Sequence, residues 1–453
     1  MIMAKKTFKL PAAAVVAISF LAVILLGTAL LCLPFASRDG SVNFLNALFT
    51  ATSASCVTGL IVVDTSAHWS YFGQAVILLL IQVGGLGFIT IMSLFMLYVK
   101  KHASLSQRKL VMQSAGSVDL AGIKGLVKYI LIGTAACEFT GAFLLSISFV
   151  RAYGWGLGIW QAVFTSISAF CNAGFTVTGV GEGVGSLSLT GFVSDPLVNI
   201  VVMLLIVIGG IGFFVWGDVV RHGIHIKKYS FHSKVVLTTT GILIVTAWAL
   251  FMAFEWNNPE TIGGEGVGTK IMATLFMAIT PRTAGFNTID YGSASAGGHA
   301  LTTVLMCIGG SPGSTAGGIK TATIAVFVLT AVATSRRNDE THIFKRRFEA
   351  DAGHQASVIV CLYLFVIIVS TLLICGVEGS KFLLQDILFE VTSAVGTVGL
   401  STGITASLTV FSKVVLVLLM FFGRVGGYTL ILVFSHDKKP VAISRVAEKI
   451  IIG

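Results

Sequence analysis

Four glycine residues recur at nearly equal intervals along this chain of 453 residues, and each is followed by Leu or Phe. They are Gly59, Gly174, Gly285 and Gly399, which lie 115, 111 and 114 residues apart. Because glycine adopts positive φ without steric cost, a segment built around it can turn several carbonyls to one side. Rings of carbonyl oxygens replace the hydration shell of a cation in selective pores. The spacing therefore points to the binding of a dehydrated cation by backbone oxygens.

Each of these glycines ends a short apolar segment. A helix of about 12 residues is too short to cross a bilayer and is typical of a re-entrant segment. Non-helical backbone at membrane depth is tolerated only where it is buried in protein or lines water. Four helix C-termini meeting at one axis would favour a cation, and the absence of a carboxylate ring argues against a divalent-cation pore. The segments read NFLNALFTATSASCVTGL (43–60), WQAVFTSISAFCNAGF (160–175), KIMATLFMAITPRTAGF (270–286) and LQDILFEVTSAVGTVGL (384–400).

The rest of the chain is built to lie in a membrane. Apolar residues make up 55% of it and charged residues only 11%, against about 25% charged residues in soluble domains. This composition excludes a soluble enzyme, a secreted disulfide scaffold and a disordered protein. Apolar segments of about 20 residues or more predict eight transmembrane helices. They cover residues 11–33, 71–99, 122–150, 196–220, 234–255, 298–334, 354–376 and 408–434.

Basic residues cluster after every second predicted helix. Of the 30 Lys and Arg residues, 22 fall on one side of the predicted membrane. The positive-inside rule makes this side cytoplasmic and puts both termini there. The 22 residues are Lys5, Lys6, Lys9, Lys100, Lys101, Arg108, Lys109, Lys124, Lys128, Arg221, Lys227, Lys228, Lys234, Arg336, Arg337, Lys345, Arg346, Arg347, Lys438, Lys439, Arg445 and Lys449.

The helices and short segments form a unit that occurs four times. A second glycine pattern follows each short segment: QVGGLGF (82–88), VIGGIGF (207–213), CIGGSPG (307–313) and GRVGGYT (423–429). A constant period indicates a repeat architecture. We therefore expect an all-α polytopic membrane protein with four pseudosymmetric helix–pore loop–helix repeats around a central ion pathway. The expected repeats span residues 1–111, 112–228, 229–347 and 348–453, the last including a C-terminal tail.

The four segments resemble the filter segments of the Trk/Ktr/HKT superfamily of potassium transporters, and the resemblance runs along the whole chain. It rests on CVTGL, CNAGF, TPRTAGFN and GTVGL. Because the first repeat begins at the start of the chain, the sequence is most similar to the Ktr membrane subunit of the B or D type. Glycine at all four positions resembles the potassium-selective members. The resemblance implies a selectivity filter made of Val57, Thr58, Gly59, Asn172, Ala173, Gly174, Thr283, Ala284, Gly285, Thr397, Val398 and Gly399.

The third unit contains a break in its second predicted helix. Residues 309–318 include five Gly, one Pro and three hydroxyl residues, which together disfavour a continuous helix. In the resembled family this loop is the intramembrane gate, and Arg424 matches an arginine beside it. We expect Arg424 to hold the closed loop through its carbonyls, with Lys320 assisting. The implied gate comprises Gly309, Gly310, Ser311, Pro312, Gly313, Ser314, Thr315, Ala316, Gly317, Gly318, Lys320 and Arg424.

Arg282, Glu390 and Glu138 are among the further charged residues in predicted membrane segments, where a charge is costly and usually has a role. Arg282 stands at the end of the third short segment, and we expect it to neutralise the helix end and to pair with a carboxylate. Glu390 is the candidate partner. Glu138, in the third predicted helix, is expected to be paired structurally.

Two other functions fit parts of the sequence. Gly309 to Gly313 matches GxSxG, the nucleophile elbow of serine hydrolases, and would make the chain an intramembrane serine hydrolase. A serine nucleophile needs a nearby base, whereas all nine histidines fall in loops or at helix ends. The other function is a sodium-coupled secondary cation symporter, although such folds usually contain two repeats, often inverted. We therefore expect a transporter and not an enzyme.

The resemblance to Ktr subunits also implies cargo and partners. The transported ion would be K⁺, bound at the filter, with Na⁺ as a second candidate. The chain would form a homodimer on a cytosolic octameric ring of nucleotide-binding RCK subunits, and a nucleotide would act only through that ring. The basic loops would contact the ring or anionic lipid, and the apolar tail at 450–452 would lie at the dimer interface. The expected location is the bacterial plasma membrane, with no nucleic-acid partner.

Overall fold

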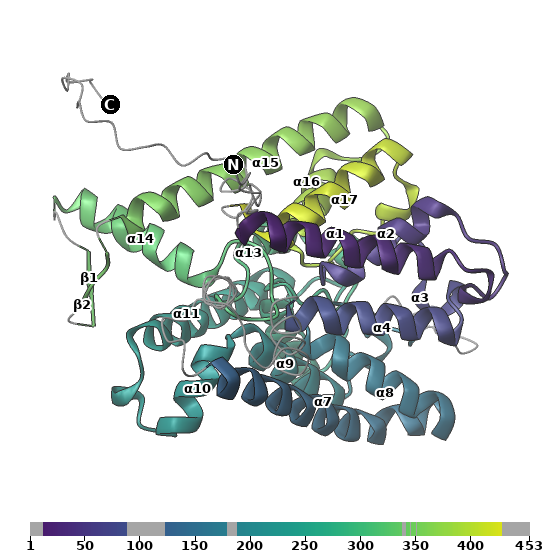
Figure 1. Ribbon diagram of the computed structural model, residues 1–453, viewed down its shortest axis with the longest axis horizontal. Helices are drawn as coiled ribbons and strands as arrows, with labels where there is room; N and C mark the ends of the chain where they lie inside the picture. The colour runs from purple at the N-terminus through teal and green to yellow at the C-terminus, as the bar shows by residue number, and fades with distance from the viewer. Residues whose placement is uncertain are drawn as a thin grey trace, which may run out of the picture.

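The computed structural model describes residues 12–87, 123–178, 188–337, 341–344, 346–349 and 351–427. These residues are largely helical, with one short hairpin (Figure 1). The elements are α1 (Ala12–Leu31), η1 (Pro34–Ala36), α2 (Phe44–Ser55), α3 (Thr65–His68), α4 (Tyr71–Leu86), α7 (Ile123–Tyr153), α8 (Trp155–Phe170), η2 (Thr190–Phe192), α9 (Pro196–Gly210), α10 (Phe213–His222), η3 (Ile226–Lys228), α11 (Phe231–Glu255), α12 (Val267–Ile279), η4 (Tyr291–Ser293), α13 (Ala296–Cys307), α14 (Thr321–Ser335), β1 (His342–Ile343), β2 (Arg346–Arg347), α15 (Ala352–Glu378), α16 (Leu384–Gly396), η5 (Thr405–Ser407) and α17 (Val410–Val425).

Polar residues at helix starts explain where several helices begin. Asn43, Ser70 and Ser295 precede α2, α4 and α13, and each side chain accepts a hydrogen bond from a backbone N–H of the first turn. Such N-caps satisfy donors that the helix itself leaves unpaired. The caps therefore mark helix starts that the surrounding apolar sequence alone does not define.

Four helices of the described residues are long and apolar enough to cross a bilayer, namely α1, α7, α11 and α15. Large apolar side chains on their outer faces are exposed, as at Phe139 (76%) and Phe365 (64%). An exposed apolar surface of this kind is suited to lipid rather than water. Helices α4, α13 and α14 are apolar but shorter. The structure therefore supports a polytopic membrane protein.

Two of the predicted spanning helices are not continuous. The segment predicted at 298–334 is divided into α13 and α14 by the loop at 309–318, as expected. The segment predicted at 196–220 is also broken, because α9 and α10 meet at an angle of 99°. This second break was not predicted. It occurs at Gly212, whose φ of 95° is outside the helical range.

The helices form four groups that pack in a cycle. Each group has a short helix packed on a preceding long one: α2 on α1, α8 on α7, α12 on α11 and α16 on α15. The next helix of each group contacts the short helix of the following group, as α4 contacts α8, α9 contacts α12 and α13 contacts α16. Helix α17 closes the cycle on α2, and Figure 1 shows these two helices together. All four short helices therefore face a common centre.

The described basic loops lie at one end of the molecule. The hairpin of β1 and β2, between α14 and α15, and the turn around η3 both lie at the left of Figure 1. The rings of Phe231 and Phe348 are 5.4 Å apart and join these two loops. Twelve of the basic residues named above fall outside the described residues: Lys5, Lys6, Lys9, Lys100, Lys101, Arg108, Lys109, Lys345, Lys438, Lys439, Arg445 and Lys449. The tail at 450–452 does so too.

Candidate ion-binding site

Each short helix ends in the same backbone conformation. Two residues before each of the four glycines stands a non-glycine residue with positive φ: Val57 (56°), Asn172 (59°), Thr283 (65°) and Thr397 (52°). The glycines themselves have φ of 96°, 70°, 75° and 90°, and the residues between have ordinary negative φ. Positive φ at a branched residue is strained and persists only where surrounding structure enforces it. The alternating sign of φ turns successive peptide planes so that their carbonyls can share one side.

The four glycines form a closed ring. A Cβ added to Gly59 would lie 2.5 Å from the carbonyl oxygen of Ala173, and one added to Gly174 would lie 2.9 Å from that of Ala284. A Cβ added to Gly285 would likewise overlap with the carbonyl oxygen of Val398, and one added to Gly399 with the carbonyl oxygen of Thr58. Each predicted filter segment thus touches the next, and the cycle closes. Side chains at these positions would collide with the backbone, which explains why all four are glycine.

Backbone hydrogen bonds attach each segment to its own short helix. The N–H groups of Thr58, Ala173 and Val398 each donate at 2.8 Å to a carbonyl five residues earlier. In the third segment, the N–H of Ala284 donates instead to Thr280, four residues earlier, at 3.0 Å. Pro281, which has no N–H, lies within this turn. The four segments are therefore fixed locally, with one variant of the hydrogen-bond pattern in the third.

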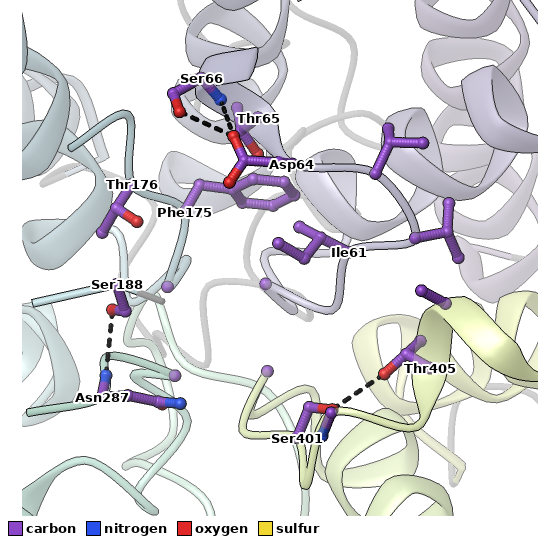
Figure 2. Close-up of a pocket in the computed structure, with 18 of the residues that line it drawn as sticks. Ile61, Asp64, Thr65, Ser66, Phe175, Thr176, Ser188, Asn287, Ser401 and Thr405 are labelled. Carbon is purple, nitrogen blue, oxygen red and sulfur yellow. Dashed lines mark hydrogen bonds between the residues drawn. The ribbon is translucent and has the colours of Figure 1, made fainter. Parts of the chain in front are cut away.

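A cavity of about 450 Å³ lies on one side of the ring. The four glycines form part of its wall, together with the residues that follow them in each segment. Figure 2 shows Asp64, Ser188, Asn287 and Ser401 around this space, each from a different part of the chain. Among the described residues, the lining includes the carboxylates of Asp64 and Asp290 and no Lys or Arg. This electrostatic environment favours cations over anions.

The predicted gate loop lies on the opposite side of the ring, against residues that precede the glycines. A Cβ on Gly317 would overlap with the side chain of Thr397. The hydroxyl of Thr315 donates to the carbonyl of Phe170 at 3.3 Å, at the end of α8. The N–H of Ser311 donates to the carbonyl of Gly210 at 2.9 Å, at the break between α9 and α10. The loop therefore packs against the fourth segment and is attached by hydrogen bonds to the second group of helices.

Arg424 and Lys320 both donate to carbonyls at this level. The guanidinium of Arg424 donates to the carbonyl of Thr315 in the loop and to the carbonyl of Gly84 at the end of α4. The ammonium of Lys320 donates to the carbonyl of Ala316 at 2.6 Å. The observed bond to Thr315 is of the kind expected from the sequence, whereas the bond to Gly84 was not expected. Arg424 thus connects the loop to both the fourth and the first group of helices.

The second glycine pattern has a packing role, and its fourth copy matches the first two through Gly423. A Cβ on Gly84, Gly209 or Gly423 would overlap with the carbonyl oxygen four residues before the filter glycine of the same group. These glycines let α4, α9 and α17 pack against the ends of their short helices. Three residues further on, Gly87, Gly212 and Gly426 adopt positive φ. The correct match is therefore through Gly423, which puts Arg424 at the position occupied by Gly85 and Gly210.

The expected partners of the buried charges were partly wrong. Arg282 forms no ion pair with any described carboxylate, and among the described residues its guanidinium donates one hydrogen bond, to the hydroxyl of Thr240 at 3.2 Å. Glu390 accepts hydrogen bonds from Ser401 and Thr405, not from Arg282. Arg282 lies in the turn after α12, whereas Glu390 lies in α16, where nearby serine and threonine hydroxyls satisfy the carboxylate.

Two further observations bear on the sequence interpretation. Glu138 accepts two hydrogen bonds from the amide of Gln82, at 3.0 and 3.2 Å, so it has a structural partner. The hydroxyl of Ser311, the serine of the GxSxG match, has no hydrogen-bond partner among the described residues. A serine without a base is not activated as a nucleophile. Within the described residues, no group of three or more His, Cys, Asp or Glu side chains is placed to hold a metal ion.

The sequence interpretation missed two features of this site. One is the role of Glu390, whose hydroxyl partners follow Gly399 by a few residues and were visible as a cluster of Ser and Thr in 401–405. The other is that α4, α9 and α17 all end next to a glycine of positive φ. The spacing Gly-x-x-Gly at 84–87, 209–212 and 423–426 indicates these helix ends. In the first two copies, adjacent glycine pairs overlap with this spacing and make it less conspicuous.

Comparison with known proteins agrees with this geometry. The family model described as TrkH, cation transport protein, matches residues 5–441. Ktr system potassium uptake protein B of Bacillus subtilis is 39% identical over 94% of this chain and 93% of its own length. The potassium/sodium uptake protein NtpJ of Enterococcus hirae is 39% identical over 97% of this chain and 96% of its own length.

The fold is also similar to a solved structure. The crystal structure of the potassium transporter TrkH from Vibrio parahaemolyticus superposes with a TM-score of 0.71 at 18% identity, over 95% of this chain and 86% of that one. At this identity the superposition establishes the fold. The matched family model and the two relatives establish the family. The chain is a membrane protein that belongs to the TrkH family of cation transport proteins.

Proposed function

We propose that this chain is the potassium-translocating membrane subunit of a Ktr-type uptake system. The observation that carries the proposal is the closed ring of Gly59, Gly174, Gly285 and Gly399, in which each glycine meets the backbone of the next segment. Four short helices direct their C-terminal ends at this ring, and helix C-termini favour cations. A ring of carbonyls suits K⁺, which sheds its hydration shell readily to backbone oxygens.

The ring would act as a selectivity filter formed by the twelve residues named from the sequence. The cavity above it would collect hydrated cations, and the filter would replace their water. The closed packing cycle of the helices supports four helix–pore loop–helix repeats, with boundaries near residues 112, 229 and 348, and eight transmembrane passes. In this arrangement, the second helix of a repeat includes the shorter pieces α4, α13 with α14, and α17.

The loop at 309–318 would act as the gate. Its hydrogen bonds to Gly210 and Phe170, together with the bonds from Arg424 and Lys320, support a closed position across the axis. The two cations would also oppose the passage of K⁺ while the loop is closed. Opening would require these bonds to break and the loop to leave the axis.

Topology and partners follow the positive-inside rule and the relatives. We place the basic loops and both termini in the bacterial cytoplasm. A homodimer on an octameric ring of nucleotide-binding subunits would complete the system, with the nucleotide acting only through the ring. The similarity to a Ktr system protein supports a partner subunit.

Reconstitution tests this function. The purified chain in potassium-free liposomes should admit K⁺ from outside at a rate far above that of empty liposomes, measured with a potassium-sensitive dye. Expression should restore growth of a potassium-uptake-deficient bacterium at low K⁺. Liposomes that remain impermeable to K⁺, together with failed rescue, would refute the proposal.

A sodium-coupled symporter is the second candidate, because one relative is named for both potassium and sodium uptake. The two candidates differ in stoichiometry. If K⁺ entry drives obligatory Na⁺ entry at a fixed ratio, the chain is a symporter. If Na⁺ only changes the rate of K⁺ entry, it is a channel-like subunit that sodium regulates.

A further inference from the structure

A serine stands six residues before the filter glycine in three of the four segments. These are Ser53, Ser168 and Ser393, and each is fully buried. The third segment has Ile279 at this position. Serine is a poorer helix former than alanine, so helix stability does not explain three buried serines at the same place.

The three serines differ in what their hydroxyls bind. The hydroxyl of Ser53 accepts a hydrogen bond from the N–H of Gly59 at 3.1 Å. The hydroxyl of Ser393 accepts one from the N–H of Gly399 at 3.0 Å. The hydroxyl of Ser168 has no hydrogen-bond partner within the part of the chain that the structure describes. The same residue, equally buried, therefore holds the filter glycine in the first and fourth segments and not in the second.

Peptide geometry connects this hydrogen bond to the ion path. A trans peptide is planar, so the N–H of Gly59 and the carbonyl of Thr58 belong to one plane and point in opposite directions. A hydroxyl that holds the N–H therefore also fixes the direction of the carbonyl. A Cβ on Gly399 would overlap with the oxygen of Thr58, and one on Gly285 would overlap with the oxygen of Val398. Both of these carbonyls thus face the neighbouring glycine of the ring.

We infer that Ser53 and Ser393 are positioning residues of the filter, and that each hydroxyl keeps the carbonyl of Thr58 or Val398 turned toward the ion. The inference rests on the proposed filter and extends it, because it assigns ion discrimination to residues outside the twelve that form it. The two serines act on adjacent segments of the ring. Without the hydroxyl, the buried N–H of Gly59 or Gly399 loses its hydrogen-bond partner. Rotation of that peptide away from its present orientation then costs less free energy.

The test compares serine variants of the full chain in liposomes. The K⁺/Na⁺ flux ratio should fall about fivefold in Ser53→Ala and in Ser393→Ala, the factor that corresponds to one ordinary hydrogen bond. Ser168→Ala is the matched control, since it removes the same atoms from the same burial without removing a bond, and its ratio should stay within about twofold of the parent. Ser393→Thr, which keeps the hydroxyl, should retain most of the K⁺/Na⁺ flux ratio of the parent.

A second measurement does not depend on transport. K⁺ should raise the melting temperature of the parent and of Ser168→Ala more than it raises that of Ser53→Ala, while the melting temperatures in Na⁺ stay alike. A merely structural role would lower the melting temperature equally in both salts. That result, or flux ratios of Ser53→Ala and Ser393→Ala equal to that of Ser168→Ala, would overturn the inference.

Gly399→Ala separates this result from a failure of the filter itself. If Gly399→Ala loses K⁺ selectivity while the serine variants keep it, the filter stands and the positioning role is wrong. If Gly399→Ala also keeps the parent ratio, the filter proposal fails and the serine inference fails with it.

Discussion

The glycine ring and the loop at 309–318 face the proposed ion path from opposite sides, but different kinds of bond hold them. The filter segments are attached to their own short helices, as in the bond between Gly59 and Ser53, six residues apart. The loop is attached to distant parts of the chain. Its bond to Phe170 spans 145 residues, and its bond to Arg424 spans 109 residues.

This difference has a mechanical consequence. A bond within one short segment survives when helix groups move relative to one another, because both ends move together. A bond between groups breaks in such a movement. In the proposed mechanism, the loop would therefore be released without distorting the ring, so that selection and gating would remain separate.

The largest expected effect comes from breaking the ring. In Gly399→Ala, the new Cβ would overlap with the oxygen of Thr58 at a position with φ of 90°. Overpacking and left-handed strain together amount to about 3 kcal/mol, so we expect K⁺ uptake to fall by about 100-fold. Uptake of a potassium tracer by cells expressing the variant measures it.

The control for this prediction is Gly154→Ala, which also has a positive φ, of 79°, but open space around it. Its uptake should stay close to that of the parent. Equal losses in both variants would mean that strain alone, and not contact within the ring, limits uptake.

A smaller and opposite effect is expected from the loop. Arg424→Ala removes the bonds to Thr315 and to Gly84, and with them the side chain that connects the loop to the end of α4. Loss of hydrogen bonds from a charged group is worth about 1.5–3 kcal/mol, so K⁺ flux without any partner should rise about tenfold. Flux per reconstituted molecule measures the effect, and Arg151→Ala, at an exposed arginine, is the control. A flux no higher than that of the parent contradicts the role of Arg424 as a lock.

The smallest effect concerns a single neutral bond. Thr315→Val removes the hydroxyl that donates to Phe170, at about 1 kcal/mol, and should raise the same flux two- to fivefold. Ser314→Ala is the matched control, since its hydroxyl bonds within the loop, to Ser311 at 2.6 Å. If the two variants behave alike, bonds between groups are no more important for closure than bonds within the loop.

Much of the fold was predictable because it is encoded locally. Apolar length predicts the helices, and the recurring glycines predict where the short helices end. The ends of α9, α4 and α17 at left-handed glycines were not predicted, because a run of apolar residues continues past them. These three helices end where they pack against the short helices, and sequence periodicity does not report that packing.

The candidate site divides in the same way. The four glycines were identified from spacing, and the structure brings them into one ring. The partners of Glu390 and Arg282 were assigned wrongly, since opposite charge is a poor guide when nearby hydroxyls satisfy a carboxylate first. The pairing of Ser53 with Gly59 is a fine detail of geometry that a shared serine pattern indicates but does not establish.

By itself, the sequence determined that this chain lies in a membrane and that four glycine segments recur along it, because apolar length and backbone freedom are properties of neighbouring residues. Only the tertiary structure decided which carbonyls Arg424 binds and which serines hold the ring. Those choices depend on groups that are far apart in the chain and come within hydrogen-bond distance only after the helices have packed.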